Sequence, residues 1–223
     1  MFDRIAGRYD LLNHLLSAGC DRRWRRLVVS LLPQGSSLSV LDLACGTGDQ
    51  LIALAASGRV AQGVGLDLAE EMLAIGREKI RRIRLERTLT LLNGDAENLG
   101  FEQNAFDAVT IAFGIRNMTD VRRSLGEILR VLKPGGRALI LEFSLPQRGF
   151  VRGPYLFYLR HILPRLGALV SGDSTAYRYL KETIETFPHG EVFCQIMRDV
   201  GFSDVSATPL TLGIVSIYRG DRQ

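Results

Sequence analysis

The sequence predicts an α/β fold, a Rossmann-like sheet of seven mostly parallel strands with helices on both faces and an antiparallel C-terminal hairpin. Two observations carry this prediction. Apolar runs of about four to eight residues alternate with amphipathic segments, which is the pattern of parallel βαβ units. The last two apolar runs, at 203–209 and 211–218, are joined by a very short turn, which favours an antiparallel pair at the sheet edge.

The individual elements follow from this alternation. A helical segment at about 10–32 comes first. Five strands are expected from the apolar runs at 38–43, 62–67, 88–93, 106–112 and 137–143. Amphipathic helices are expected at 49–57, 69–85, 119–132 and 191–200. Gly135 and Gly136, which follow Lys133 and Pro134, predict a tight turn into the fifth of these strands.

Length and composition indicate one domain that spans residues 1–223. The 223 residues are 46% hydrophobic, which is enough for a single sizeable core. Within this domain, an N-terminal helical segment is placed at 1–35. An insertion at about 146–190 breaks the rhythm of strands and helices and is rich in tyrosine and phenylalanine.

Composition also excludes several classes of protein. No run of about 18 uncharged apolar residues exists, so no membrane span is expected, and the charged N-terminus does not match a secretory signal. Cys20, Cys45 and Cys194 are scattered without metal-ligand spacing, which indicates reduced thiols, no metal site and a cytoplasmic protein. The net charge of +4 is too mild and dispersed to indicate nucleic-acid binding.

A turn with two glycines, Gly46 and Gly48, follows the apolar run at 38–43 and indicates a site where the backbone approaches a ligand. A dinucleotide site requires a third glycine, but Leu51 stands at that position. The acids Asp42 and Asp49 flank the turn and would repel phosphate. They suit a ligand with positive charge, and S-adenosylmethionine, with its sulfonium and ammonium groups, fits. The alternative is an ordinary glycine turn after a strand.

Polar residues close the next two apolar runs. Asp67 lies about 20 residues after the glycine turn, at the spacing where an acid accepts hydrogen bonds from ribose hydroxyls. Its alternative role is to cap the following helix. Asp95 and Ala96 follow the run at 88–93, where polar groups could bond an adenine amino group.

Several motifs resemble those of a known family. The glycine turn with Asp67, the Phe106-Asp107-Ala108-Val109 strand and the Leu132-Lys133-Pro134-Gly135-Gly136 turn look like those of class I S-adenosylmethionine-dependent methyltransferases. Two further segments narrow the resemblance to the menaquinone and ubiquinone biosynthesis C-methyltransferases. They are Tyr9-Asp10-Leu11-Leu12-Asn13-His14-Leu15-Leu16-Ser17, running on to Trp24, and Arg130-Val131-Leu132-Lys133-Pro134-Gly135-Gly136-Arg137, running on to Glu142-Phe143-Ser144. The segment Phe113-Gly114-Ile115-Arg116-Asn117 supports the same match. The resemblance covers nearly the whole chain and implies a Rossmann-like class I methyltransferase.

The resemblance also implies which residues contact S-adenosylmethionine. The family's cofactor positions fall on Thr47, Asp67, the Asp95–Ala96 pair and Ala112. Ala112 has no hydroxyl, so only its backbone could contribute. The chain departs from the family at Cys45, where many members have glycine, at Asp21, where a histidine is common, and at His14, where an aspartate is common.

The implied reaction methylates a ring carbon beside a phenolic hydroxyl. Arg116, with Asn117, follows the fourth strand and is expected to stabilise the phenolate charge, because arginine stays protonated and is a poor base. Proton removal is assigned to Tyr9, Asp10, His14 or a water that they hold. The alternative for Arg116 is a salt bridge that holds the end of the strand.

The implied acceptor is a prenylated quinol, with demethylmenaquinol as the first choice. The alternatives are a methyltransferase for another small apolar acceptor, including O-methylation, a nucleotide-binding dehydrogenase, and a non-catalytic cofactor-binding module. The insertion at 146–190 is expected to cover the substrate or to form an ordinary helical insertion with its own core. Its basic amphipathic stretch at 152–163 suits peripheral contact with the inner face of a membrane, or a partner helix. The sequence leaves oligomerisation open.

Overall fold

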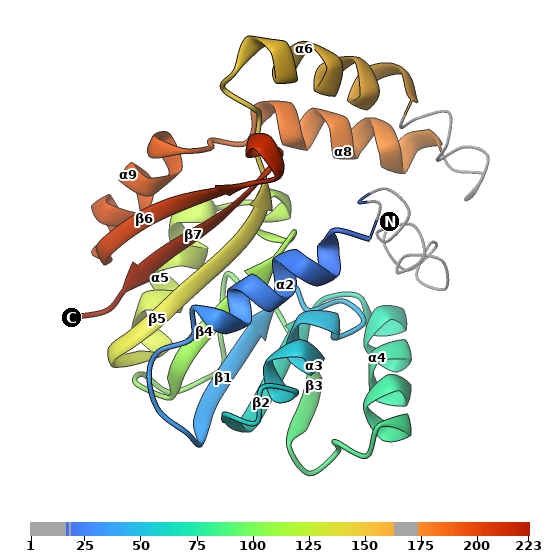
Figure 1. The fold of residues 1–223 in the computed structure, drawn as a ribbon. Coiled ribbons are helices and arrows are strands. Elements are labelled where there is room, and N and C mark those ends of the chain that lie inside the picture. Colours follow the sequence, from blue (N-terminus) through green and yellow to red (C-terminus); the bar gives the residue numbers. More distant parts are fainter. Residues whose placement is uncertain (1–16, 18, 163–173) are drawn as a thin grey trace.

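The computed structural model describes residue 17, residues 19–162 and residues 174–223. Its centre is a seven-stranded sheet with the order β3-β2-β1-β4-β5-β7-β6. Five strands pair in parallel, and β7 runs antiparallel to both of its neighbours. The predicted sheet with its antiparallel C-terminal hairpin is therefore confirmed (Figure 1).

The strands lie close to the predicted runs. Their bounds are β1 (Leu38–Leu43), β2 (Val60–Asp67), β3 (Leu89–Asn93), β4 (Phe106–Ala112), β5 (Leu132–Phe143), β6 (Ser203–Leu210) and β7 (Val215–Asp221). β5 begins earlier than predicted, because the pairing with β4 jumps from Leu132 to Arg137 and the Gly135–Gly136 turn is a bulge within the strand. β7 begins later than predicted, because Thr211 and Leu212 adopt positive φ in the short helical turn η4 (Thr211–Gly213).

The helices cover both faces of the sheet, as predicted. Their bounds are α2 (Asp21–Ser30), α3 (Asp49–Ala55), α4 (Glu70–Arg82), α5 (Val121–Val131), α6 (Gly149–Phe157), α8 (Ser174–Thr186) and α9 (Glu191–Val200). The helix predicted at about 10–32 appears as the shorter α2, since residues 10–16 lie outside the described part. The α4 helix also ends before its predicted bound at residue 85, because Arg84 adopts positive φ.

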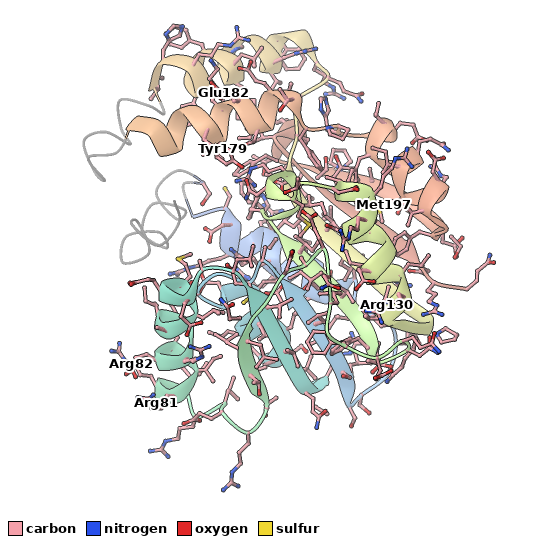
Figure 2. All side chains as sticks on the ribbon, turned by 180° about the vertical axis from the view of Figure 1, so that it is seen from behind. Arg81, Arg82, Arg130, Tyr179, Glu182 and Met197 are labelled. Atoms are coloured by element: carbon pink, nitrogen blue, oxygen red, sulfur yellow. The ribbon has the colours of Figure 1, made fainter. Side chains whose placement is uncertain are left out.

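Two hydrophobic clusters hold the layers together. One cluster joins α5 and α9 to Leu41, Leu43 and Ile111 on one face of the sheet, and Met197 of α9 belongs to it (Figure 2). The other cluster joins α2, α3 and α4 to Val40 and Leu139 on the opposite face. Because side chains alternate along a strand, Asp42 faces the same side as Val40, toward α2 and α3.

The insertion forms a helical pair above the end of β5 (Figure 1). It contains α6, the π-helical turn η3 (Tyr158–Ile162) and α8. Leu145, Tyr155, Leu159 and Ile184 form a small separate core. This cluster includes Leu145, which precedes the insertion, and packs against Phe143 and Ile214. Both expected roles of the insertion, as a substrate cover and as a helical insertion with its own core, therefore stay predictions. Within the described residues, no helix has the length and apolar character to cross a bilayer.

Candidate functional site

A cleft of about 290 Å³ opens at the carboxyl ends of the parallel strands. Its walls come from the segments that follow β1, β2, β3 and β4. The strand order reverses between β1 and β4, and open α/β sheets bind ligands at such a switch point. The cleft contains the predicted residues Gly46, Asp67, Asp95, Ala96 and Asn117.

Glycine is required where the segments after β1 and β4 approach each other. A Cβ atom at Gly114 would lie 2.4 Å from the Cβ of Ala44, which is too close for any other residue. Gly46 and Gly48 adopt φ values of +54° and +81°, so the chain turns back sharply before α3 begins. The predicted glycine turn is therefore present, and it forms the floor of the cleft.

The carboxylate of Asp67 organises the turn. Its Oδ2 accepts a hydrogen bond of 2.7 Å from the backbone N–H of Gly46, and its Oδ1 accepts one of 2.9 Å from the N–H of Ala69. The second bond lies at the start of α4, as the alternative role anticipated. Each carboxylate oxygen has two lone pairs, so Asp67 keeps the capacity to accept from a diol in the cleft.

The opposite wall carries Asp95 and a residue that the sequence reasoning missed. Asp95 Oδ1 accepts from the backbone N–H of Glu97 at 2.8 Å. Glu97 Oε1 in turn accepts from the backbone N–H groups of Thr119 and Asp120, at 2.6 and 3.2 Å. This carboxylate ties the segment after β3 to the segment before α5. No sequence spacing signals such a contact between distant segments of the chain.

A smaller pocket of about 20 Å³ adjoins the cleft, and the two share Ala44 and Gly46. Its other lining residues are Arg25, Asp42, Cys45, Thr47, Asp49, Gln50 and Ala112. Thr47 and Asp49 both bond to Lys79 Nζ at 2.8 Å. Burial raises the pKa of the Cys45 thiol, which makes it a poor nucleophile. Three predicted cofactor positions, Asp42, Thr47 and Ala112, thus lie together.

Asp42 is the electrostatically unusual residue of this pocket. Its side chain is only 1% exposed, Thr110 Oγ1 donates to its Oδ1 at 2.5 Å, and its Oδ2 has no hydrogen-bond partner among the described residues. Burial raises its pKa to about 7, although the Thr110 hydrogen bond and the charge of Arg25 oppose the rise. A buried, half-satisfied carboxylate is well suited to bind a cationic group.

Arg116 lies beside the cleft, in the short turn η2 (Ile115–Asn117) after β4. Its Nη1 donates to Glu142 Oε1 at 2.7 Å and to the carbonyl of Phe113 at 2.6 Å. The alternative salt bridge is therefore present, and the ion pair is almost completely buried. Burial raises the pKa of Glu142, and the guanidinium of Arg116 opposes this rise.

Near Arg116, where the methyl-group acceptor is expected to bind, two buried polar atoms make no hydrogen bond within the described structure. Arg116 Nε and Asn117 Oδ1 are buried without a hydrogen-bond partner among the described residues. Tyr155 and Tyr158 of the insertion have pKa values raised by burial, so both phenols stay protonated at neutral pH. The other predicted catalytic residues, Tyr9, Asp10 and His14, lie outside the described residues.

The donor set fits S-adenosylmethionine. A carboxylate for a ribose diol lies in the larger cleft, and an under-satisfied carboxylate for a cation lies in the smaller pocket. In the part of the chain that is described, no cluster of histidine, cysteine, aspartate or glutamate is arranged to hold a metal ion.

We expect Asp42→Asn to stabilise the ligand-free protein at neutral pH. The pKa of Asp42 rises from its ordinary 3.8 to about 7 on folding, so between these values the folded state binds more protons than the unfolded state. The free energy of unfolding therefore falls as pH rises through this window. The substitution should remove that loss, which is on the order of 1–4 kcal/mol above pH 7.

Thermal unfolding at a series of pH values tests this expectation. The gain in melting temperature of Asp42→Asn over the unchanged protein should grow from about pH 4 to about pH 7 and then level off. Asp204→Asn, which alters an exposed carboxylate, is the control and should leave the pH dependence unchanged. A gain that does not vary with pH would contradict the proposed cost of ionising Asp42.

Comparison with known proteins agrees with this site. Residues 1–222 match the ubiE/COQ5 methyltransferase family. A demethylmenaquinone methyltransferase from Thermus thermophilus is 48% identical over 222 residues, with 100% of both chains covered. A ubiquinone/menaquinone biosynthesis C-methyltransferase UbiE from Syntrophotalea carbinolica is 46% identical over 222 residues, covering 100% of this chain and 92% of the relative.

Solved structures share the fold at low sequence identity. A SAM-dependent methyltransferase from Aquifex aeolicus superposes with a TM-score of 0.65 at 18% identity, covering 89% of each chain. The phosphoethanolamine N-methyltransferase 2 of Haemonchus contortus, in complex with S-adenosyl-L-methionine, gives a TM-score of 0.67 at 17% identity and covers 89% of this chain and 52% of that one. The fold, the site and the full-length match together show that this chain is a methyltransferase and belongs to the ubiE/COQ5 methyltransferase family.

Proposed function

We propose that this enzyme transfers a methyl group from S-adenosylmethionine to a ring carbon of a prenylated quinol. Demethylmenaquinol is the acceptor that we propose in the first place. One observation carries the proposal: Asn117 lines the cofactor cleft, and its neighbour Arg116 presents a buried guanidinium under an aromatic insertion. The names of the relatives, demethylmenaquinone methyltransferase and UbiE, support this choice of acceptor.

The chain's contribution to this reaction is mainly positioning. S-adenosylmethionine supplies an electrophilic methyl group, whose transfer breaks a carbon–sulfur bond and forms a carbon–carbon bond. The methylated ring carbon then gives up its hydrogen as a proton, which restores the aromatic ring. Asp67 would hold the ribose, and Asp42 would face a positive charge of S-adenosylmethionine. With the cofactor held in this way, its methyl group would point toward the Arg116 side of the cleft. Holding the two reactants in line can supply roughly 7–11 kcal/mol of the barrier.

Arg116 would stabilise the phenolate oxygen of the acceptor. Glu142 neutralises part of its charge, so the stabilisation comes from directed hydrogen bonds rather than from a free cation. Among the described residues, the Nε–H and the Nη2 group of Arg116 make no hydrogen bond, so these donors are available for this task. In a dry site, such a donor strengthens as charge develops on the oxygen.

The insertion would cover the acceptor. The α8 helix contacts η2, which contains Arg116 and Asn117, and the ring of Phe143 lies 5.3 Å from the Arg116 guanidinium. Because the phenols of Tyr155 and Tyr158 hold their protons, they can donate hydrogen bonds but are poor bases at neutral pH. Proton removal therefore stays assigned to Tyr9, Asp10, His14 or a bound water.

The proposed function predicts that only the reduced acceptor reacts. In a quinol, oxygen lone pairs make the ring carbon nucleophilic, whereas the carbonyls of a quinone make it electrophilic. We expect methylation of demethylmenaquinol after chemical reduction and none of the oxidised quinone, with a rate that rises with pH until the hydroxyl ionises. Mass spectrometry and NMR of the product should place the methyl group on carbon. Equal rates with both redox forms, or an O-methylated product, would overturn the proposal.

A second prediction separates the catalytic role of Arg116 from its structural one. Changing Arg116 alone would leave Glu142 buried without its partner, which costs about 3–5 kcal/mol and confuses the result. We therefore compare the unchanged protein with the double variant Arg116→Gln/Glu142→Gln, because neither leaves a buried charge of this pair without its partner. The double variant should fold and bind S-adenosylhomocysteine as the unchanged protein does.

Its kcat should nevertheless be lower by about 100-fold or more, the usual cost of removing a donor to a developing oxyanion. Calorimetry gives the cofactor affinity and steady-state assays give kcat. If the double variant and the unchanged protein have the same kcat, Arg116 serves only to hold the end of the strand.

We also propose that the protein acts in the cytoplasm and contacts the inner face of the membrane through α6 and η3. Phe150 and Phe157 are 74% and 59% exposed, and Arg152 is exposed nearby. Arg160 is also exposed but forms an ion pair with Glu185. Apolar rings flanked by basic residues match the surface of an anionic bilayer. A prenylated acceptor resides in that bilayer, so such contact would bring the insertion to its substrate.

Sedimentation with vesicles that contain anionic lipid tests this contact. Binding should be weak, should fall as salt is raised because exposed charges are screened, and should drop further in Phe150→Ser/Phe157→Ser. Val192→Ser, which removes an equally exposed apolar side chain from α9, is the matched control and should bind as the unchanged protein does. The absence of binding at low salt would instead favour a helix that packs on a protein partner.

A further inference from the structure

We propose that Arg25 is the counterion for the carboxylate of the amino-acid end of S-adenosylmethionine, and that Gln50 hydrogen-bonds the same end. This inference rests on the proposed cofactor. It assigns a role to two residues that none of the sequence motifs singled out.

Arg25 belongs to α2, outside the strand-and-turn motifs that mark the cofactor site. The helix is anchored by Trp24, which is buried and donates from Nε1 to Thr211 Oγ1 at 2.8 Å. The ring of Trp24 also lies 6.0 Å from that of Phe113 at the end of β4. This anchoring holds the next residue, Arg25, against the small pocket beside the glycine turn.

The guanidinium of Arg25 is held in place but is not neutralised. It lies 5.8 Å from the centre of the Phe113 ring, and its buried Nε has no hydrogen-bond partner within the described part of the chain. No ion pair joins it to any residue in the described part of the chain, Asp42 included. A cation in such a position favours an anionic group that arrives with a ligand.

Gln50 provides an independent sign of a missing polar ligand. Its side chain is 1% exposed, and both its amide oxygen and its amide nitrogen lack partners among the described residues. A buried amide that makes none of its hydrogen bonds is destabilising, and native structures rarely leave one so. Gln50 lines the same pocket as Arg25 and Asp42.

The charges of the pocket match a zwitterion. Among the described residues, Asp42 Oδ2 and Arg25 Nε each lack a hydrogen-bond partner, so the pocket offers one acceptor and one donor of opposite charge. An α-amino acid carries an ammonium and a carboxylate on one carbon, so it can satisfy both. The remaining charged groups are engaged, because Asp49 pairs with Lys79. The pocket's volume of about 20 Å³ holds about one water-sized group, so the amino-acid end would also occupy the adjoining cleft, which shares Ala44 and Gly46 with the pocket.

Three ligands that differ only at the amino-acid end test the assignment by calorimetry. S-adenosylhomocysteine has both charges, its decarboxylated form S-adenosyl-3-thiopropylamine has only the amine, and 5′-methylthioadenosine has neither. Arg25→Met should weaken S-adenosylhomocysteine by about 10- to 100-fold, the range for a hydrogen-bonded charge pair. It should change the affinity for the other two ligands less than about twofold, since neither has a carboxylate.

Three further variants keep the test decisive. Arg25→Lys retains the charge without the forked donors and should recover part of the lost affinity. Arg23→Met removes an exposed arginine about 200° around the same helix and should bind all three ligands normally. Gln50→Leu should raise the melting temperature of the ligand-free protein and reduce the increase that S-adenosylhomocysteine produces.

The outcomes separate this inference from the proposed function. If the unchanged protein binds S-adenosylhomocysteine and Arg25→Met binds it equally well, the assignment of Arg25 is wrong while the proposed function stands. If Arg25→Met weakens all three ligands to the same degree, Arg25 only supports the shape of the site. If the unchanged protein binds none of the three, the proposed cofactor itself is wrong.

Discussion

The site depends on one carboxylate that joins two segments of backbone. Asp67 ends β2 and accepts hydrogen bonds from Gly46 after β1 and from Ala69 before α4. Parallel strands bring these segments to the same sheet edge but leave their conformations undetermined. Hydrogen bonds to a charged acceptor are about twice as strong as neutral ones. Asp67 therefore fixes the glycine turn in place, and this turn positions Thr47 and Gln50 next to Asp42 of β1 around the small pocket.

The same region contains buried polar and charged groups whose hydrogen bonds are incomplete, which is energetically unfavourable. Asp42, Arg25 and Gln50 are held by well-packed neighbours, but some of their polar atoms have no hydrogen-bond partner among the described residues. These unsatisfied groups lower the stability of the ligand-free fold, and a ligand that supplies the partners gains the same free energy on binding. Arg116 and Glu142 differ, because each already has the other as its ion-pair partner.

The sheet and the cofactor cleft could be predicted because their signals are local. Buried strands such as β1 and β4 are short apolar runs, and a glycine turn with an acid about 20 residues later has a recognisable spacing. The partners of Asp67 and Arg116 could be anticipated only as alternatives, since both roles use the same residue type. The bulge in β5 was missed because Lys133-Pro134-Gly135-Gly136 has the composition of a turn whether or not the strand continues past it. Arg25, Gln50 and Glu97 were missed because what distinguishes them is a pocket or a contact formed between distant segments.

The position of β7 constrains how the chain can fold during synthesis. β7 follows β6 in sequence, yet it lies between β5 and β6 in the sheet. When a ribosome has released β6 but not β7, β6 has no neighbour to pair with, and β5 presents an open edge of unpaired backbone groups. At roughly 5–20 residues per second this interval is brief, but a pause within it would expose both strands to other nascent chains. Translation speed through residues 203–221 is therefore expected to influence how much of this protein reaches its native state.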